Sequence, residues 1–309
     1  MTKTAFLFAG QGAQKLGMAR DLYENFEIVR ATYDEASVIL GYDLRELIDK
    51  KADELNETKY TQPAILATSV GILRLLAAHD IKPDAVAGLS LGEYSALVAS
   101  GSLAFSDAIA LVAKRGQFMA EAAPTGSGKM VAVMNTPADV IEEACKLASE
   151  RGIVSPANYN TPAQIVIGGE VAAVDYAVEL LTVAGVKRMI PLKVSGPFHT
   201  AILAPASDRL SEVLETVNFS DFNIPLVSNT TAQVMPVSEI KPLLTRQVMS
   251  PVRFYESIET LVSLGVTDFI EIGPGKVLSG FVKKIDKSAG IIHVEDLATF
   301  EALLATLEK

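Results

Sequence analysis

The segment Gly88-Leu-Ser-Leu-Gly92 constrains the fold more than any other part of this chain. It follows a short apolar run, residues 85–88, and a helical pattern begins at Glu93. Two glycines let the backbone turn sharply where a Cβ atom would collide, so the hydroxyl of Ser90 would stand at the edge of a sheet. The first N–H groups of the following helix would point toward developing negative charge. We interpret the segment as a nucleophile elbow, against the alternative of a glycine-bounded loop with an incidental serine.

Composition places the chain among globular proteins and narrows its partners. Its 309 residues leave room for one large domain or two ordinary ones, and 49% of them are hydrophobic. The formal net charge is −10, which would repel the phosphate backbone, so we expect no nucleic-acid partner. The single cysteine, Cys145, excludes an internal disulfide and fits a reducing compartment. We interpret it as a buried structural thiol in a helix.

Neither an export signal nor a membrane span is expected from the apolar segments. The N-terminal run Thr4–Ala9 is too short for the hydrophobic region of a signal peptide. The uncharged stretch from Tyr60 to Leu73 is too short to cross a bilayer. We therefore expect a cytoplasmic protein without membrane contact.

Strands and helices are predicted to alternate along the first part of the chain. Ala5–Ala9 is a continuous apolar run, typical of a parallel strand covered on both faces. A helix is expected over 63–78 with Pro63 in its first turn, and a strand over 86–88. Ser106 and Asp107 would open a further helix that runs to Met119. This order predicts an α/β fold with a mostly parallel sheet.

A different rhythm follows the glycine-rich segment 124–129, which we interpret as a domain junction. The expected elements are strand 130–134, helix 137–149, strand 153–158, strand 164–168, helix 171–184 and strand 188–194. The order β-α-β-β-α-β is that of the split ferredoxin-like arrangement. We therefore predict a small α+β domain over 126–194, inserted into a larger one formed by 1–125 and 195–309.

Two glycine clusters resemble nucleotide-binding motifs but fail in detail. Gly10-Gln-Gly12 follows a strand, yet Lys15 stands where a dinucleotide fingerprint has its third glycine. Around 126–129, Ala123 and Met130 replace the first glycine and the hydroxyl residue of a P-loop. We therefore expect no nucleotide cofactor.

A serine nucleophile needs a base, and the chain has only three histidines. They lack the spacing of a metal site, so no metal is expected. His79 would end a helix and His293 would lie in a late strand, which are both structural positions. His199 lies in the loop Ser195–Thr200, where functional residues concentrate, and we predict it as the base.

The acidic member of a serine triad is not evident. Asp107 and Asp139 have the positions of helix-start residues, and Asp175 that of a helix-surface residue. The sequence therefore favours a Ser–His dyad whose ring is oriented by a backbone carbonyl, because orienting the imidazole is the main task of the acid.

Six segments occur in an order that resembles the malonyl-CoA:acyl carrier protein transacylase family of bacterial fatty-acid synthesis, and also the acyltransferase domains of polyketide synthases. They are Gly10–Gln14, Gly88–Ser95, Lys114–Gly116, Gly196–His199, Arg246–Gln247 and Glu271–Gly275. The resemblance spans nearly the whole chain. It implies a hydrolase-like large domain with a parallel sheet and a nucleophile elbow, together with a ferredoxin-like insertion.

The resemblance also implies catalytic roles. Ser90 matches the acylated nucleophile and His199 the general base and acid. The backbone of Gln11 would help to form the oxyanion hole, with the Leu91 amide as the second donor. The main chain of Gln247 would orient the histidine.

Substrate-binding roles follow in the same way. Arg115 matches the residue that pairs with the malonyl carboxylate, for which a guanidinium offers a fixed fork. Phe198 resembles the bulky residue of malonyl-selective members, and Met119 and Asn158 are the other expected substrate contacts. One departure stands at Leu89, where the family commonly has histidine.

These residues predict an enzyme that moves malonyl from malonyl-CoA to the phosphopantetheine thiol of acyl carrier protein by ping-pong kinetics. Coenzyme A thioester enters as substrate, and we expect no cofactor and a monomer. The alternatives are a serine esterase or thioesterase, a polyketide-pathway acyltransferase, and a carrier-docking protein with an inert Ser90. Arg115 argues against an esterase, because esterases bind apolar acyl chains.

Overall fold

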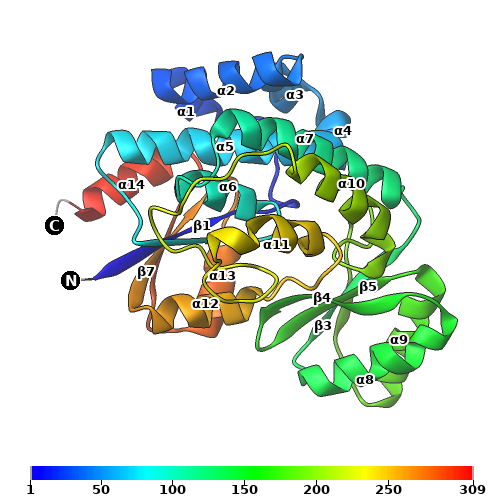
Figure 1. Ribbon diagram of the computed structural model, residues 1–309. Helices are drawn as coiled ribbons and strands as arrows, with labels where there is room; N and C mark the ends of the chain where they lie inside the picture. The colour runs from blue at the N-terminus through cyan, green and yellow to red at the C-terminus, as the bar shows by residue number, and fades with distance from the viewer. Residues whose placement is uncertain (1, 308–309) are drawn as a thin grey trace.

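The computed structural model describes residues 2–307 and contains two separate four-stranded sheets with helices around them (Figure 1). The first sheet is parallel, in the order β2 (Ala85–Gly88), β1 (Lys3–Phe8), β7 (Val266–Ile272), β8 (Gly290–Val294). The second is antiparallel, in the order β4 (Val154–Thr161), β5 (Gln164–Gly169), β3 (Lys129–Met134), β6 (Met189–Pro191). The fold is therefore mixed α/β, as the alternation of elements predicted.

Strand β1 lies between β2 and β7, and its apolar run is covered on both faces, which confirms the prediction for this segment. Phe6 and Phe8 belong to the larger hydrophobic core, whereas Ala5 and Leu7 belong to the core on the opposite face. Because side chains alternate across a strand, a continuous apolar run of this kind can only be accommodated with helices on both sides.

Helices form layers over the two faces of the parallel sheet. The larger core is built with α5 (Thr58–Ala78) and α7 (Phe105–Ala122), and α2 (Glu27–Leu40) packs on both as an outer layer (Figure 1). The opposite core is built with α12 (Phe254–Ser263) and α13 (Val277–Ile285). The other α-helices described outside the segment of the antiparallel sheet are α1 (Arg20–Asn25), α3 (Leu44–Lys50), α4 (Ala52–Leu55), α6 (Gly92–Ala99), α10 (Ala204–Leu214), α11 (Ile240–Gln247) and α14 (Leu297–Leu307).

Helix α5 begins at Thr58, so the expectation that Pro63 lies in the first turn of a helix is wrong. The additional turn is polar in sequence but buried, with Thr61 and Gln62 at most 1% exposed, and its residues therefore carry no apolar periodicity. At 21 residues α5 is long and apolar enough to cross a membrane, yet 78% of its most apolar window is buried inside the protein. It is a core helix of the fold.

The second sheet follows the predicted element order, with α8 (Ala138–Ala148) after β3 and α9 (Val171–Val183) after β5. Both helices pack on one face of this sheet, where Cys145 is buried as expected (Figure 1). The edge strand β4 continues into the rest of the molecule, because Tyr159 N–H donates to Val252 O at 2.8 Å and Val252 N–H to Ala157 O at 2.8 Å.

Strand β6 is shorter than predicted, since it ends at Pro191 rather than at residue 194. Leu192 N–H still donates to Met130 O at 2.9 Å, but the chain then leaves the sheet. Leu192, Lys193 and Val194 line a cavity instead. The alternation of apolar residues in this segment is typical of a strand. The same alternation also occurs in a segment that lines a cavity, so the prediction of a longer strand was wrong.

Close packing between β1 and the start of α6 leaves no room for a side chain at Gly92. A Cβ atom there would lie 2.1 Å from Phe8 O. We therefore predict that Gly92→Ala lowers the free energy of unfolding by about 1–3 kcal/mol or more. The matched control is Gly280→Ala within α13, where a Cβ atom would meet nothing within 4 Å. It should stabilise the helix by about 0.5–1 kcal/mol, and equal urea-unfolding midpoints for the two variants would contradict the packing argument.

Candidate active site

Ser90 lies in the turn between β2 and α6 with a φ of 54°, a left-handed conformation that is costly for a serine. Asn229 holds this turn by two hydrogen bonds: its Oδ1 accepts from Ser90 N–H at 2.6 Å, and its Nδ2 donates to Gly88 O at 2.6 Å. A Cβ atom at Gly88 would lie 2.0 Å from the carbonyl carbon of Gly92. The two glycines and Asn229 together stabilise the strained backbone conformation of Ser90.

His199 faces Ser90 across the site. Its Nε2 lies 2.7 Å from Ser90 Oγ, and its Nδ1 lies 2.8 Å from the main-chain oxygen of Gln247. A hydrogen on Nδ1 that is donated to this carbonyl leaves Nε2 free to accept the serine proton. Among residues 2–307 no carboxylate is hydrogen-bonded to His199, and Asp175 pairs with Lys129 instead. The geometry is that of a dyad oriented by a backbone carbonyl.

Arg115, from α7, is only 1% exposed and points at the same oxygen. Its Nη2 donates to Ser90 Oγ at 3.2 Å and to Gln247 Oε1 at 3.0 Å. Its Nη1 donates to Gln62 Oε1 at 2.7 Å. Burial lowers the pKa of Arg115, an effect that Tyr94 and Glu93 oppose. The side chain is a buried cation beside Ser90, not a solvated arginine on a helix surface.

Two backbone N–H groups beside Ser90 have no hydrogen-bond acceptor within the described part of the chain. They belong to Leu91, at the start of α6, and to Gln11, in the loop after β1. This loop presses against the turn, since a Cβ atom at Gly10 would lie 2.4 Å from Leu89 O. The Gln11 side chain is fixed by Thr58, to whose Oγ1 it donates at 3.0 Å. An oxyanion hole requires two free backbone donors close to the serine, and these two N–H groups are the candidates.

The dyad opens into a cavity of about 650 Å³, a size that suits an extended thioester substrate. Of the residues predicted to bind substrate, Met119, Asn158 and Phe198 line this cavity. Leu89 lines it too and packs against the apolar cluster that contains Leu278, so the position where the family commonly has histidine is part of an apolar wall here.

Burial and charge set the ionisation of the base. Burial lowers the pKa of His199 to about 4, and the neighbouring Arg115 cation lowers it as well. The imidazole is therefore neutral at physiological pH and can accept a proton. In the described chain no group of three or more His, Cys, Asp or Glu side chains is placed to hold a metal ion.

Three residues that support the site have no evident signal in the sequence. Gln62 holds Arg115 and Asn229 holds the turn, but both contacts join segments far apart in the chain. Glu93 directly follows the turn, where an acidic residue ordinarily serves the helix dipole. It is instead 1% exposed and hydrogen-bonded to Gln247.

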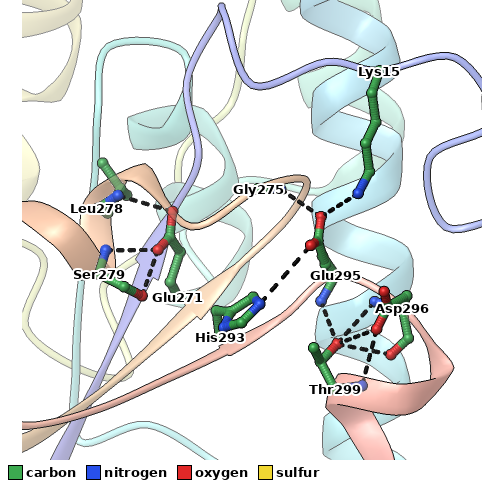
Figure 2. Close-up of polar contacts among 9 residues, drawn as sticks. All are labelled: Lys15, Glu271, Gly275, Leu278, Ser279, His293, Glu295, Asp296 and Thr299. Carbon is green, nitrogen blue, oxygen red and sulfur yellow. Dashed lines mark hydrogen bonds and ion pairs between the residues drawn. The ribbon is translucent and has the colours of Figure 1, made fainter.

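Two carboxylates, Glu271 of β7 and Glu295 directly after β8, fix the loops beside the parallel sheet (Figure 2). Glu271 accepts from Leu278 N–H at 3.0 Å and Ser279 N–H at 2.6 Å, which satisfies donors at the start of α13. Glu295 accepts from Lys15 Nζ at 2.6 Å and Gly275 N–H at 2.7 Å, and so ties the loop after β1 to the end of β8 (Figure 2).

The other two histidines lie at the positions in the fold that the sequence predicted. His293 lies in β8, with Nε2 3.8 Å from Glu295 Oε1. His79 ends α5 and contacts Leu75 O through Nδ1 at 2.9 Å.

Comparisons with known proteins agree with this geometry. The family model described as acyl transferase domain matches residues 5–303. The malonyl CoA-acyl carrier protein transacylase of Bacillus subtilis is 47% identical over all of this chain and 98% of its own length. That of Haemophilus influenzae is 44% identical over 98% of both chains.

Solved structures extend the likeness to three dimensions. The crystal structure of MCAT from Streptococcus pneumoniae superposes with a TM-score of 0.97 at 68% identity, covering 98% of this chain and 100% of that one. A type II PKS acyl-carrier protein in complex with its malonyl-transacylase, PlMCAT:AntF, gives 0.95 at 42% identity, over 99% of this chain and 100% of that one. The chain is therefore an acyltransferase and belongs to the malonyl CoA-acyl carrier protein transacylase family.

Proposed function

We propose that this enzyme transfers the malonyl group of malonyl-CoA to the phosphopantetheine thiol of acyl carrier protein through a malonyl-Ser90 ester. One observation carries the proposal: a base and a cation converge on a single oxygen. Ser90 Oγ lies 2.7 Å from His199 Nε2 and 3.2 Å from Arg115 Nη2. In a malonyl thioester one methylene separates the carbonyl under attack from the free carboxylate, so a carboxylate-binding group must stand this close to the nucleophile.

The reaction proceeds by two acyl transfers. His199 takes the Ser90 proton as Oγ attacks the thioester carbonyl, and the N–H groups of Leu91 and Gln11 stabilise the oxyanion. The C–S bond breaks, and coenzyme A leaves with the proton that His199 returns. The carrier thiol then attacks the ester, gives its proton to His199, and releases Ser90 as an alcohol.

Selectivity rests on the residues that surround the acyl group. Arg115 provides charged hydrogen bonds to the malonyl carboxylate, worth about 1.5–3 kcal/mol net. Phe198, which is nearly buried in the cavity wall, crowds an α-methyl branch and so disfavours methylmalonyl-CoA. Met119 and Asn158 complete the contacts with substrate. Equal turnover of malonyl-CoA and methylmalonyl-CoA would contradict the role of Phe198.

The finer fold assignments support the same function. We assign the turn at Ser90 as the nucleophile elbow of a hydrolase-like large domain, residues 1–125 and 195–309. We assign 126–194 as a ferredoxin-like insertion, on the strength of its strand order and fully antiparallel pairing. The insertion contributes Asn158 to the cavity that Ser90 also lines.

Malonyl-CoA and acyl carrier protein are the proposed partners, as the names of the relatives and the carrier complex indicate. We propose that the enzyme acts as a cytoplasmic monomer without a further cofactor. A carrier protein is acidic, and Lys193 lies on the cavity wall. We propose that the phosphopantetheine arm of the carrier protein enters beside this lysine. Hydrolysis is the competing reaction, since an esterase would release malonate when no thiol is present.

The covalent intermediate gives the most direct test. Mixing enzyme with malonyl-CoA should release one equivalent of coenzyme A in a burst and add a malonyl mass to the peptide that contains Ser90. Ser90→Ala should show neither. A malonyl adduct that persists in the variant would refute Ser90 as nucleophile, and steady release of malonate without carrier protein would favour an esterase.

Arg115→Ala should lower kcat/KM for malonyl-CoA by about 10- to 100-fold, because two charged hydrogen bonds to the carboxylate are lost. Acetyl-CoA, which has no carboxylate, should be affected less, so the malonyl-to-acetyl ratio falls. Arg115→Lys should lie between, since an ammonium is a point charge without the fork. An equal loss for both thioesters would contradict the assignment.

The low pKa of His199 predicts an unusual pH profile. Acylation of Ser90 by a neutral ester such as p-nitrophenyl acetate should stay constant from pH 8 downward and fall only near pH 4, where the buried imidazole gains a proton. Protonation favours the unfolded chain as the pH falls below about 6.5, since the pKa is lower in the folded state, so circular dichroism must accompany each point. An acid limb at pH 6.5 in folded enzyme would contradict the prediction.

A further inference from the structure

Arg115 is a buried cation without a direct counterion in the described part of the chain. Its guanidinium donates hydrogen bonds only to neutral oxygens, those of Gln62, Gln247 and Ser90, and lies 5.2 Å from the centroid of the Tyr94 ring. It takes part in no salt bridge within the described residues. Taking a charge out of water without a partner is costly, so some group must hold this cation in place when no substrate is bound.

Glu93 is the carboxylate nearest to this cation in the hydrogen-bond network, and one amide separates the two groups. Gln247 Oε1 accepts from Arg115 Nη2 at 3.0 Å, and Gln247 Nε2 donates to Glu93 Oε2. The same Nε2 donates to Ser90 O at 3.0 Å. A reversed amide would place its NH₂ group against the guanidinium, donor to donor, so this network permits one orientation of Gln247.

Both carboxylate oxygens of Glu93 accept hydrogen bonds from fixed N–H donors. Oε1 accepts from Asn229 N–H at 3.2 Å, and Oε2 accepts from Gln247. Burial raises the pKa of Glu93 to about 7, but these donors and the Arg115 charge act in the opposite direction. Two N–H donors, one on each oxygen, favour the ionised carboxylate over the protonated form.

We propose that Glu93 is a positioning residue for substrate selection, which holds the Gln247 amide in the single orientation that aims Arg115 at the acyl carboxylate. The proposal rests on the function proposed above. A carboxylate placed directly on Arg115 would compete with the substrate for the guanidinium. Set one neutral amide away, Glu93 stabilises the cation and leaves its outer N–H groups free for the incoming carboxylate.

Glu93→Gln tests this arrangement, because the substituted amide keeps the shape but offers one acceptor in place of two. The N–H of Asn229 belongs to the backbone and cannot turn, so the new NH₂ group faces Gln247. The Gln247 amide then turns over and presents its own NH₂ group to Arg115. Ser90 O loses the same donor, whereas the contact of the Gln247 main-chain oxygen with His199 Nδ1 is kept. We expect malonate binding, measured by titration calorimetry, to weaken by about tenfold or more, with a matching rise in KM for malonyl-CoA.

Acylation of Ser90 by p-nitrophenyl acetate should remain within about threefold of the wild-type rate, since His199 is oriented by the main chain of Gln247 and not by its side chain. A merely structural role would lower both activities together. That parallel loss, or unchanged malonate binding, would overturn the proposal.

The double variant Glu93→Gln, Gln247→Glu exchanges acid and amide. The hydrogen bonds between the two positions and Arg115 are again matched, but the carboxylate now lies directly against Arg115. Malonate binding should stay weak although Arg115 and the Asn229 N–H group again have acceptors, while Ser90 O loses the donor at position 247. Wild-type affinity in this variant would overturn the proposal.

Asp43→Asn is the matched control, since the Asp43 carboxylate likewise accepts a backbone N–H donor, that of Glu46 at 2.8 Å, at the start of α3. Asp43 does not line the cavity, and in the described chain its side chain has no hydrogen bond to Gln247 or Arg115. It should lower the unfolding midpoint without changing the malonyl-to-acetyl ratio, and a fall in that ratio would overturn the specificity assigned to Glu93. Absence of a malonyl adduct in the wild-type enzyme would instead refute the proposed function, whereas the malonate titration does not depend on turnover.

Discussion

The hydrogen bonds of Gln247 join the separate parts of this site. Its main-chain oxygen contacts His199 Nδ1, and its side-chain oxygen accepts a hydrogen bond from Arg115. Its side-chain nitrogen donates hydrogen bonds to Ser90 O and Glu93. One residue at the end of α11 thereby sets the orientation of the base, the cation and the turn. Since each contact fixes a different segment, a small shift of α11 would disturb every group at once.

Much of the fold could be predicted because its signals are local. The apolar run of β1, the glycines around Ser90 and the element order after residue 129 each specify their own backbone. The candidate site could be located for the same reason: a serine between glycines and one histidine in a loop stand out from their neighbours. The scarcity of histidines then left a single candidate base.

The parts that could not be predicted depend on contacts between distant segments. Asn229 supports the Ser90 turn from 139 residues away, and Gln62 holds Arg115 across 53 residues. The first turn of α5 is polar because it faces this site, and the loop after β6 alternates apolar residues because it lines the cavity. In both places tertiary contacts overrode the periodicity that a helix or a strand would show.

In the proposed mechanism, Arg115 connects substrate choice with the ionisation of His199. The cation that suits a carboxylate also disfavours a proton on His199, in addition to the effect of burial. The dyad needs a neutral imidazole. The charge of Arg115 therefore contributes both to the selection of a carboxylate substrate and to keeping His199 neutral. This coupling works only if Arg115 stays charged in a buried position, where burial opposes it. The carboxylate of Glu93, held one amide away, satisfies that requirement without occupying the place of the substrate.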